Sequence, residues 1–214
     1  RVAEFDAMVR LIECPSRIEK NPEIAARNRA MMETLFATGM RISELISLNH
    51  AHIDATGRMF IQGKGRKERC CPIWPQTAQL LRNLCMELNI ELDSKERIFR
   101  NCRGTPLTRF GVYYILKMCL KHAQTSTDSL RSKRLYPHSM RHSNAVALLR
   151  SGVDLTTISQ WLGHSDSKTT NLYAVIDLEM KRKAIERVKP LKSRETCTPP
   201  WHRDKTVIEW LESL

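Results

Sequence analysis

Apolar residues recur at helical spacing along most of the chain. The segments that show this spacing in the first two thirds are 1–13, 22–38, 41–48, 76–88 and a stretch that ends near residue 123. Apolar side chains three or four residues apart lie on one face of an α-helix. Pro15 predicts the end of the first helix, and Gly39 stands where a helix-ending glycine is expected. The first two thirds are therefore predicted to be mainly helical.

One short region departs from this pattern. Residues 58–62 and 69–73 are short segments that suit β-strands. Between them, Gly63 and Gly65 place two glycines in three residues, which indicates a tight turn. We predict a small antiparallel hairpin with a basic tip, and a fold class that is mainly α with this small β-hairpin (α+β).

The last third is predicted to hold three more helical pieces. They follow a polar loop over 124–134, and they run from about 139 to 150, from the good N-cap Asp154 to 162, and onward from about 167. Residues 191–206 contain two adjacent prolines and read as a linker, and 207–214 form a short amphipathic segment. We therefore expect one domain over 1–190, followed by a linker and docking segment over 191–214.

The charge balance points to a polyanionic partner. The 35 Lys and Arg residues exceed the 23 Asp and Glu residues, which gives a net charge of +12. Nucleic acid and an acidic membrane surface both fit this charge, and a basic surface without a partner is the alternative. No run of 18 apolar residues occurs, so a transmembrane helix is not expected. The chain begins with Arg1 and without a recognisable leader, so we expect no signal peptide and a fragment of a longer protein.

The cysteines predict a reducing compartment. There are seven, with irregular spacing and no C-x-x-C pair. An odd, scattered set argues against a disulfide framework and against a structural zinc site. We expect free thiols in a cytoplasmic protein.

Two positions in the first third are candidates for phosphate chemistry. Arg41 and Glu44 are three residues apart and share one helix face, so the carboxylate can orient a phosphate-binding guanidinium or simply form a surface ion pair. Lys64, at the hairpin tip, can reach a phosphate and deliver a proton, or it is a solvated turn residue. The G-x-x-x-x-G-K-[ST] spacing is absent, which disfavours a phosphate-binding loop of the nucleotide-hydrolysing type.

Further candidate residues lie in the last third of the chain. His138 and Arg141 open a helix, whose free N–H groups can attract an anion. His138 and His142 have a metal-ligand spacing, but the glutamate of H-E-x-x-H and a third ligand are missing, so no metal is expected. Taken singly, His164 suits a helix cap, and Tyr173 suits a core or an interface.

Together these positions resemble the catalytic domain of the tyrosine recombinase (phage integrase) family. The order is Arg41, Lys64, His138-x-x-Arg141, Leu-Gly-His164 and then Tyr173. The stretches that carry the resemblance are 37–45, 63–69, 137–142 and 151–164, and it extends over about residues 1–188. Five motifs occur in the family's order and spacing.

The resemblance implies a role for each position. Arg41 and Arg141 match the two arginines that clamp the scissile phosphate, and Lys64 matches the lysine that protonates the leaving 5′ oxygen. Tyr173 matches the nucleophile, which forms a 3′-phosphotyrosyl link. Glu44 matches an acidic residue that supports the arginines.

The remaining implied contacts are also with DNA. His138 matches a histidine that bonds the phosphate and assists proton transfer at the tyrosine, and His164 matches a second histidine donor to the phosphate. Arg66 and Lys67, beside Lys64 at the hairpin tip, are expected to bind DNA. The resemblance implies site-specific cutting and rejoining of DNA without metal, ATP or other cofactor.

The partners follow from the same resemblance. We expect double-stranded DNA as the partner and no membrane. We expect self-association into a tetrameric synapse on DNA, although this fragment alone can be monomeric. The expected location is cytoplasmic and nucleoid-associated. The segment 191–214 is expected to dock onto a neighbouring subunit or onto its own domain. Integration, excision, resolution and transposition all remain open.

Two departures and two alternatives complete the comparison. Asn144 stands where an aromatic residue is common, which we expect to affect packing rather than chemistry. The family's N-terminal DNA-clamping domain is not in this chain, so weak site binding is expected, because affinity rises with the number of phosphate contacts. A type IB topoisomerase and a DNA-binding protein without catalysis are the alternative readings, and the Leu-Gly-His164 motif favours a recombinase over the former.

Overall fold

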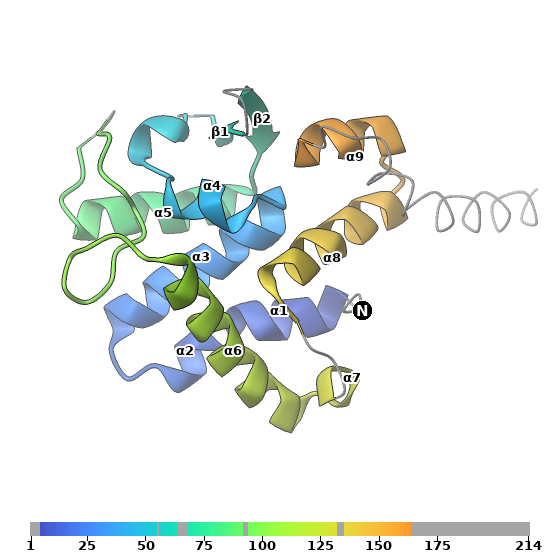
Figure 1. Ribbon diagram of the computed structural model, residues 1–214, viewed down its shortest axis with the longest axis horizontal. Helices are drawn as coiled ribbons and strands as arrows, with labels where there is room; N and C mark the ends of the chain where they lie inside the picture. The colour runs from blue at the N-terminus through green and yellow to red at the C-terminus, as the bar shows by residue number, and fades with distance from the viewer. Residues whose placement is uncertain (1–4, 55, 64–67, 92–93, 132–134, 164–214) are drawn as a thin grey trace, which may run out of the picture. The chain divides into compact units, whose positions relative to one another are not determined.

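The computed structural model describes residues 5–54, 56–63, 68–91, 94–131 and 135–163 (Figure 1). The helices of this part are α1 (Phe5–Glu13), α2 (Pro15–Ile18), α3 (Pro22–Thr38), α4 (Ile42–Ile46), the 3-10 helix η1 (His50–His52), α5 (Pro75–Glu87), α6 (Arg109–Ser126), α7 (Asp128–Arg131), α8 (Pro137–Arg150) and α9 (Leu155–Leu162). The strands are β1 (Arg58–Gln62) and β2 (Glu68–Pro72). The predicted fold class, mainly α with one small antiparallel hairpin, is confirmed.

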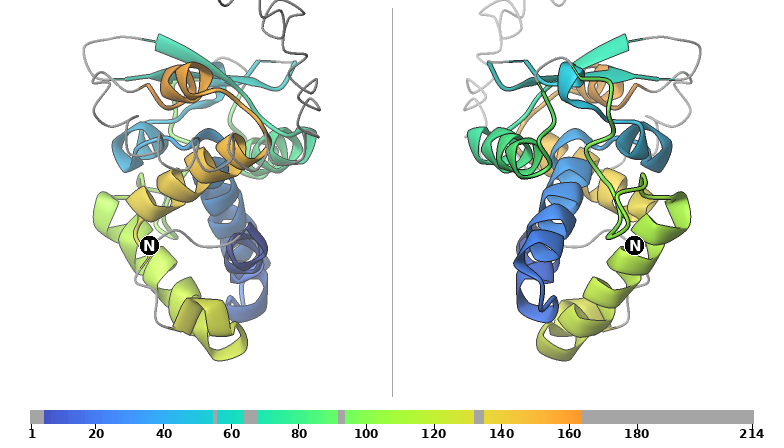
Figure 2. Two further views of the ribbon diagram at one scale, coloured as in Figure 1. Left: turned by 90° about the vertical axis from the view of Figure 1, so that its right-hand side faces the viewer. Right: turned by 90° about the vertical axis from the view of Figure 1, so that its left-hand side faces the viewer.

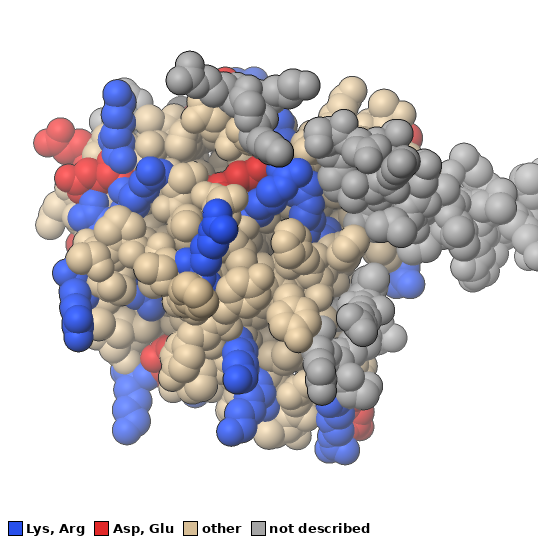
Figure 3. Space-filling model, viewed as in Figure 1, with Lys and Arg blue, Asp and Glu red and all other residues tan. Residues whose placement is uncertain are grey.

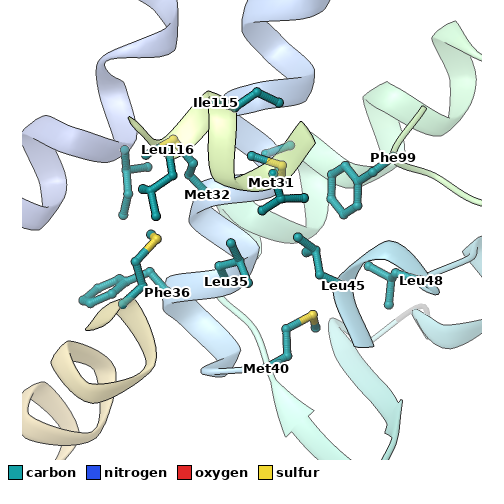
Figure 4. Close-up of a cluster of buried hydrophobic side chains, with 14 of the residues drawn as sticks. Met31, Met32, Leu35, Phe36, Met40, Leu45, Leu48, Phe99, Ile115 and Leu116 are labelled. Carbon is teal, nitrogen blue, oxygen red and sulfur yellow. The ribbon is translucent and has the colours of Figure 1, made fainter. Parts of the chain in front are cut away.

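Helix α3 is the central element of the fold. It contacts α1, α2, α4, α5 and α8, and Figures 1 and 2 show it running from the region of α2 to the region of α4. Its side chains Met31, Met32, Leu35 and Phe36 are almost fully buried, and they lie within the cluster in Figure 4. Because neighbouring elements cover α3 on several sides, every residue from 30 to 38 is buried.

Both ends of α3 are fixed by local chemistry. The Asn21 side chain accepts hydrogen bonds from the N–H groups of Glu23 (2.8 Å) and Ile24 (3.3 Å), and Pro22 occupies the first helical position. Gly39 ends the helix with a φ of +59°, and a methyl group on it would lie 2.4 Å from Leu162 Cδ2. Only glycine fits both the conformation and the space at this position. The chain therefore turns sharply into α4, with Arg41 as the N-cap residue.

The hairpin packs beside the end of α9. Strands β1 and β2 pair antiparallel in a register that runs from Arg58 opposite Pro72 to Gln62 opposite Glu68, and β2 contacts α9. Met59, Ile61 and Cys71 are buried on the inner side.

Helix α9 begins and ends as the sequence predicts, and α8 ends as predicted but begins two residues earlier than expected. Pro137 takes the first position of α8. The Asp154 side chain caps α9 by accepting from Thr156 N and Thr157 N, both at 2.9 Å, and Gly163 ends it with a φ of +64°. Helix α8 lies against both α3 and α9.

Some predicted bounds were wrong. The polar loop expected over 124–134 is partly helical, because α6 continues to Ser126 and α7 follows at Asp128–Arg131. Pro15, expected only to end a helix, also begins α2, since proline suits the first turn of a helix. The helix expected near 167 and the segment 191–214 lie outside the described residues.

In the described part of the chain, no helix is both long and apolar enough to cross a membrane. Cysteines 14, 70, 71, 85, 102 and 119 are free thiols there, and Cys197 lies outside it.

Candidate active site

Three arginines converge on the C-terminal turn of α9. Arg69 Nε donates to the carbonyl oxygen of Trp161 (2.9 Å), Arg141 Nη2 to that of Leu162 (2.6 Å) and Arg41 Nη2 to that of Gly163 (3.2 Å). The last carbonyls of a helix have no partner within the helix and carry partial negative charge. Three consecutive carbonyls thus hold three guanidinium groups, which we call the arginine cluster (Arg41, Arg69 and Arg141).

The members of the arginine cluster come from separate elements. Arg41 is the N-cap of α4, Arg69 is the second residue of β2, and Arg141 lies in the second turn of α8. Arg141 is 7% exposed and also donates from Nη1 to the carbonyl oxygen of Gly39 at 2.5 Å. The glycine-ended helices α3 and α9 therefore meet at one buried guanidinium.

Glu44 binds two of the three arginines. Its Oε1 accepts from Arg41 Nη1 (2.9 Å) and Arg69 Nη1 (3.2 Å), and its Oε2 accepts from Arg69 Nη2 (2.6 Å) and from the backbone N–H of Arg41 (2.8 Å). Burial raises the pKa of Glu44, but the hydrogen bonds from Arg69 and Arg41 outweigh it and leave this pKa below its usual value. Glu44 is therefore charged, and the predicted pairing of Arg41 with Glu44 is present.

The two histidines of α8 differ in their surroundings. His138 lies in the first turn of α8, on the exposed surface, three residues before Arg141. His142 is partly buried, and burial, His138 and the charge of Arg141 all lower its pKa. Within the described residues, no group of three or more His, Cys, Asp or Glu side chains could hold a metal ion.

Asn144 closes the same region from the side of α8. It is 4% exposed, and its Nδ2 donates to the carbonyl oxygen of Ala37 at 3.3 Å. A methyl group on Gly39 would lie 3.0 Å from Asn144 Oδ1. Asn144 therefore packs on the end of α3.

The structure brings together only part of the predicted set. Arg41 and Arg141 both bind the end of α9, Glu44 binds Arg41, and His138 lies one turn from Arg141. Lys64, Arg66, Lys67, His164 and Tyr173 lie outside the described residues. In the sequence, Lys64 follows the last described residue of the hairpin's first arm, and His164 follows Gly163.

Sequence reasoning missed Arg69. The residue was part of a recognised stretch but was given no role of its own. A signal was present, because Arg69 shares the inner side of β2 with the buried Cys71, two residues on. A charged residue on the buried side of a strand requires a partner. The pattern could not show that this partner is Glu44.

The chain belongs to the phage integrase family, whose model matches residues 2–180. The fold is that of a tyrosine recombinase catalytic domain, since 90% of the chain aligns with 98% of the catalytic domain of bacteriophage HP1 integrase, at a TM-score of 0.60 and 18% identity.

Particular members of the family are also similar. The chain is 33% identical over 193 residues to tyrosine recombinase XerD of Staphylococcus epidermidis, which covers 88% of the chain and 62% of XerD. It is 34% identical over 190 residues to putative integrase/recombinase y4rC of Sinorhizobium fredii, covering 88% of the chain and 56% of that relative. The chain thus spans less than two thirds of the length of these relatives.

A solved protein–DNA complex shares the fold. The post-cleavage complex of the XerH site-specific recombinase with its palindromic difH substrate aligns with 87% of the chain and 52% of XerH. The TM-score is 0.72 and the identity is 25%.

Proposed function

We propose that the chain is the catalytic part of a site-specific DNA recombinase or integrase, which cuts and rejoins DNA strands through a covalent bond to Tyr173. The observation that carries the proposal is the convergence of Arg41 and Arg141 on the end of α9, directly before His164 in the sequence, with the buried Glu44 paired to Arg41. The similarity to XerD and to DNA-bound XerH supports the same reaction.

The arginines suit attack on a phosphodiester. When a nucleophile adds to phosphorus, negative charge builds on the non-bridging oxygens, and fixed guanidinium donors stabilise that charge. Arg41 is one third exposed, so it is held by Glu44 while remaining accessible. We assign Arg41 and Arg141 to the scissile phosphate, with His138 and His164 as further donors.

The proposed chemistry is a transesterification. The Tyr173 oxygen bonds to phosphorus as the bond from phosphorus to the 5′ oxygen breaks. His138 assists removal of the phenol proton, and Lys64 gives a proton to the leaving 5′ oxygen, so a 5′-hydroxyl and a 3′-phosphotyrosyl bond result. A second 5′-hydroxyl reverses the step on another strand.

This scheme uses no cofactor. The phosphotyrosyl bond retains the free energy of the phosphodiester, so rejoining requires no ATP. The arginines and Lys64 supply positive charge, and the histidines supply hydrogen bonds, that stabilise the transition state. We propose that the reaction needs no metal ion.

We propose double-stranded DNA as the substrate and a tetramer on DNA as the working assembly. The net charge of +12 suits a polyanion. Figure 3 shows Lys and Arg side chains spread over the visible face rather than gathered in one patch. Arg66 and Lys67 are proposed to add phosphate contacts beside Lys64. We place the protein at the nucleoid, with residues 1–190 as the catalytic domain and 191–214 as a linker and docking segment.

The test is covalent trapping. Duplexes that the chain binds are selected from a random-sequence pool, and nicked versions of the selected duplexes release a short fragment after cleavage, which prevents rejoining. We expect an SDS-resistant protein–DNA adduct that forms equally in EDTA and disappears in Tyr173→Phe. The matched control is Tyr114→Phe, which alters a tyrosine that is 65% exposed on α6.

The outcomes separate the alternatives. An adduct that requires an added divalent metal would refute the metal-free mechanism. A second outcome is that the nicked duplex is bound and remains undegraded, yet forms no adduct. That result would support a DNA-binding protein without catalysis. An adduct that reseals only its own strand, with no transfer to a second duplex, would favour the topoisomerase alternative.

A further inference from the structure

Arg69 is bound at three points within the arginine cluster. Its side chain is 10% exposed. Nη1 and Nη2 each donate to one oxygen of Glu44, at 3.2 and 2.6 Å, and Nε donates to the Trp161 carbonyl oxygen at 2.9 Å. Each nitrogen of the guanidinium thus has a fixed acceptor. This forked geometry matches a carboxylate in a way that a lysine ammonium cannot reproduce.

These bonds close a ring that includes the proposed phosphate-binding Arg41. The ring runs from the Trp161 carbonyl through Arg69 to Glu44, from Glu44 to Arg41, and from Arg41 to the Gly163 carbonyl. It begins and ends on the same turn of α9. Arg41 is therefore held from two sides, by a carboxylate and by a helix terminus, and Arg69 is the member that fixes the carboxylate.

Local packing makes room for Arg69 and ties β2 to α9. A methyl group on Gly163 would lie 3.1 Å from both Cδ and Nη1 of Arg69, so the glycine permits this close approach. Cys71, two residues along β2, donates from Sγ to the same Trp161 carbonyl at 3.4 Å. Burial raises the pKa of the Cys71 thiol to about 11, so the thiol keeps its proton.

We propose that Arg69 is a positioning residue for strand cleavage. It acts through Glu44 on Arg41, and through the Trp161 carbonyl on the turn of α9 that precedes His164. Arg69 does not itself contact the phosphate. This inference rests on the proposed function. A buried ion pair often adds little net stability compared with apolar packing, so the value of this pair lies in the orientation that it fixes.

The first test separates DNA binding from cleavage. Arg69→Lys keeps the charge but loses the fork, and Arg69→Ala removes both. On the nicked duplex at saturating protein, we expect the single-turnover cleavage rate to fall by about 10- to 100-fold. The reason is that misplacing a reacting group by about 1 Å lowers the reaction rate on the order of 100-fold. DNA affinity should change by less than about twofold, since no phosphate contact is removed.

The matched control is Arg58→Lys and Arg58→Ala on the neighbouring strand. Arg58 also pairs with a carboxylate, that of Asp54 at 2.8 Å, but its side chain is 57% exposed, and its Nε also donates to Thr56 rather than to a member of the arginine cluster. Both Arg58 variants should cleave at the rate of the unchanged chain. Equal losses at positions 58 and 69 would overturn the positioning role and indicate a general effect on the hairpin.

Chemical rescue gives a readout that a merely structural role would not move. Guanidinium ion added to folded Arg69→Ala can occupy the vacated space between Glu44 and the Trp161 carbonyl. We expect it to restore part of the cleavage rate at constant ionic strength, whereas tetramethylammonium should not. The same additions should leave Arg58→Ala unchanged.

The pH profile provides a second such readout. Among the residues that the structure describes, the charged or titratable side chains that face Glu44 are Arg41 from the start of α4, and Arg69 and Cys71 from β2. Without Arg69, the buried Glu44 loses one of two cationic partners. The cleavage rate of Arg69→Ala should therefore decline at a higher pH on the acid side than that of the unchanged chain.

The outcomes also separate this inference from the function on which it rests. Absence of any adduct with the unchanged chain would refute the proposed function, and the positioning role with it. An adduct with the unchanged chain, together with full cleavage rates in both Arg69 variants, would refute the positioning role alone. A proportional loss of DNA affinity and cleavage would show instead that Arg69 contacts DNA.

Discussion

At the scale of single residues, the site depends on one buried carboxylate. Glu44 has a side chain that is 6% exposed, yet it accepts from both Arg41 and Arg69. A buried charge of this kind is costly unless it is paired and hydrogen-bonded. The pairing also orients Arg41, because Glu44 accepts hydrogen bonds from both its guanidinium and its backbone N–H. In the proposed function, this orientation holds the guanidinium toward the scissile phosphate.

Glu44→Gln should destabilise the folded chain in a pH-dependent manner. Removing one partner of a buried ion pair leaves the other uncompensated, and we expect a loss of about 3 kcal/mol in the free energy of unfolding near neutral pH. Since the pKa of Glu44 is lowered in the folded state, its contribution is present above the unfolded value of about 4.3 and is lost as the pH falls through the folded value.

Urea unfolding of both proteins between neutral and acidic pH measures this difference. The difference in free energy of unfolding between the unchanged chain and Glu44→Gln should be constant near neutral pH and should become smaller below about pH 4.3. A difference that becomes larger on acidification would contradict the lowered pKa. The difference between the two proteins isolates Glu44 from the other carboxylates, which titrate in both.

At the scale of elements, the site is built where helices end. Helix α3 ends at Gly39 and α9 at Gly163, both with positive φ, and Arg141 donates to carbonyls at both ends. Helix ends expose carbonyls that need donors, and arginines can serve several at once. The contact of Gly39 with Leu162 sets how closely the two ends approach.

Gly39→Ala should destabilise the folded chain more than the positive φ of residue 39 alone would cause. The new methyl group would lie 2.4 Å from Leu162 Cδ2. The control is Gly104→Ala, where φ is +76° and no heavy atom lies within 4 Å of the added methyl. We expect the free energy of unfolding to fall by about 1 kcal/mol in the control and by about 3 kcal/mol in Gly39→Ala. In Gly39→Ala, the steric clash with Leu162 adds to the backbone strain of an alanine at positive φ.

Thermal or urea unfolding of the two variants provides the measurement. Cleavage by Gly39→Ala should also fall, because Leu162 and the carbonyls of α9 must shift to admit the methyl group. Equal stability losses at positions 39 and 104 would show that α3 and α9 do not meet as closely as the structure indicates.

Much of this arrangement could be predicted from sequence at the level of elements. Helical periodicity, the glycine at 39 and the cap at Asp154 predicted α3 and α9 with nearly correct ends. The order of motifs also brought Arg41, Glu44 and Arg141 into one candidate site. Periodicity is a local signal, and these local signals agreed with the tertiary fold.

Other features could not be predicted in the same way. The ring through Arg69 depends on which strand faces the end of α9, and sequence spacing does not show a contact over 92 residues. Helix α7 was missed because a short polar helix has no apolar period of its own. The same reason applies to the short helix η1, which the sequence did not predict.

At the scale of the whole molecule, the excess of positive charge should govern DNA binding. A protein that neutralises phosphates releases counterions, so the logarithm of affinity falls linearly with the logarithm of salt concentration. The net charge of +12 predicts a strong dependence even on duplexes without a target site.

Titrating duplex DNA over a range of salt concentrations measures this slope. The double variant Arg66→Gln, Lys67→Gln should reduce the slope by about 2 if each side chain contacts one phosphate. The control Arg131→Gln changes a side chain that is 67% exposed on α7 and should leave the slope within error. An unchanged slope in the double variant would exclude the hairpin tip from the DNA interface.

The proposal that Tyr173 is the nucleophile is tested most directly by locating the covalent bond to DNA. The SDS-resistant adduct is digested with nuclease and protease, and the peptide that retains a nucleotide is identified by mass spectrometry. We predict a 3′-nucleotide on Tyr173 and a free 5′-hydroxyl on the released strand. A nucleotide on Tyr113, Tyr114 or Tyr136, or attachment through a 5′-phosphate, would contradict it.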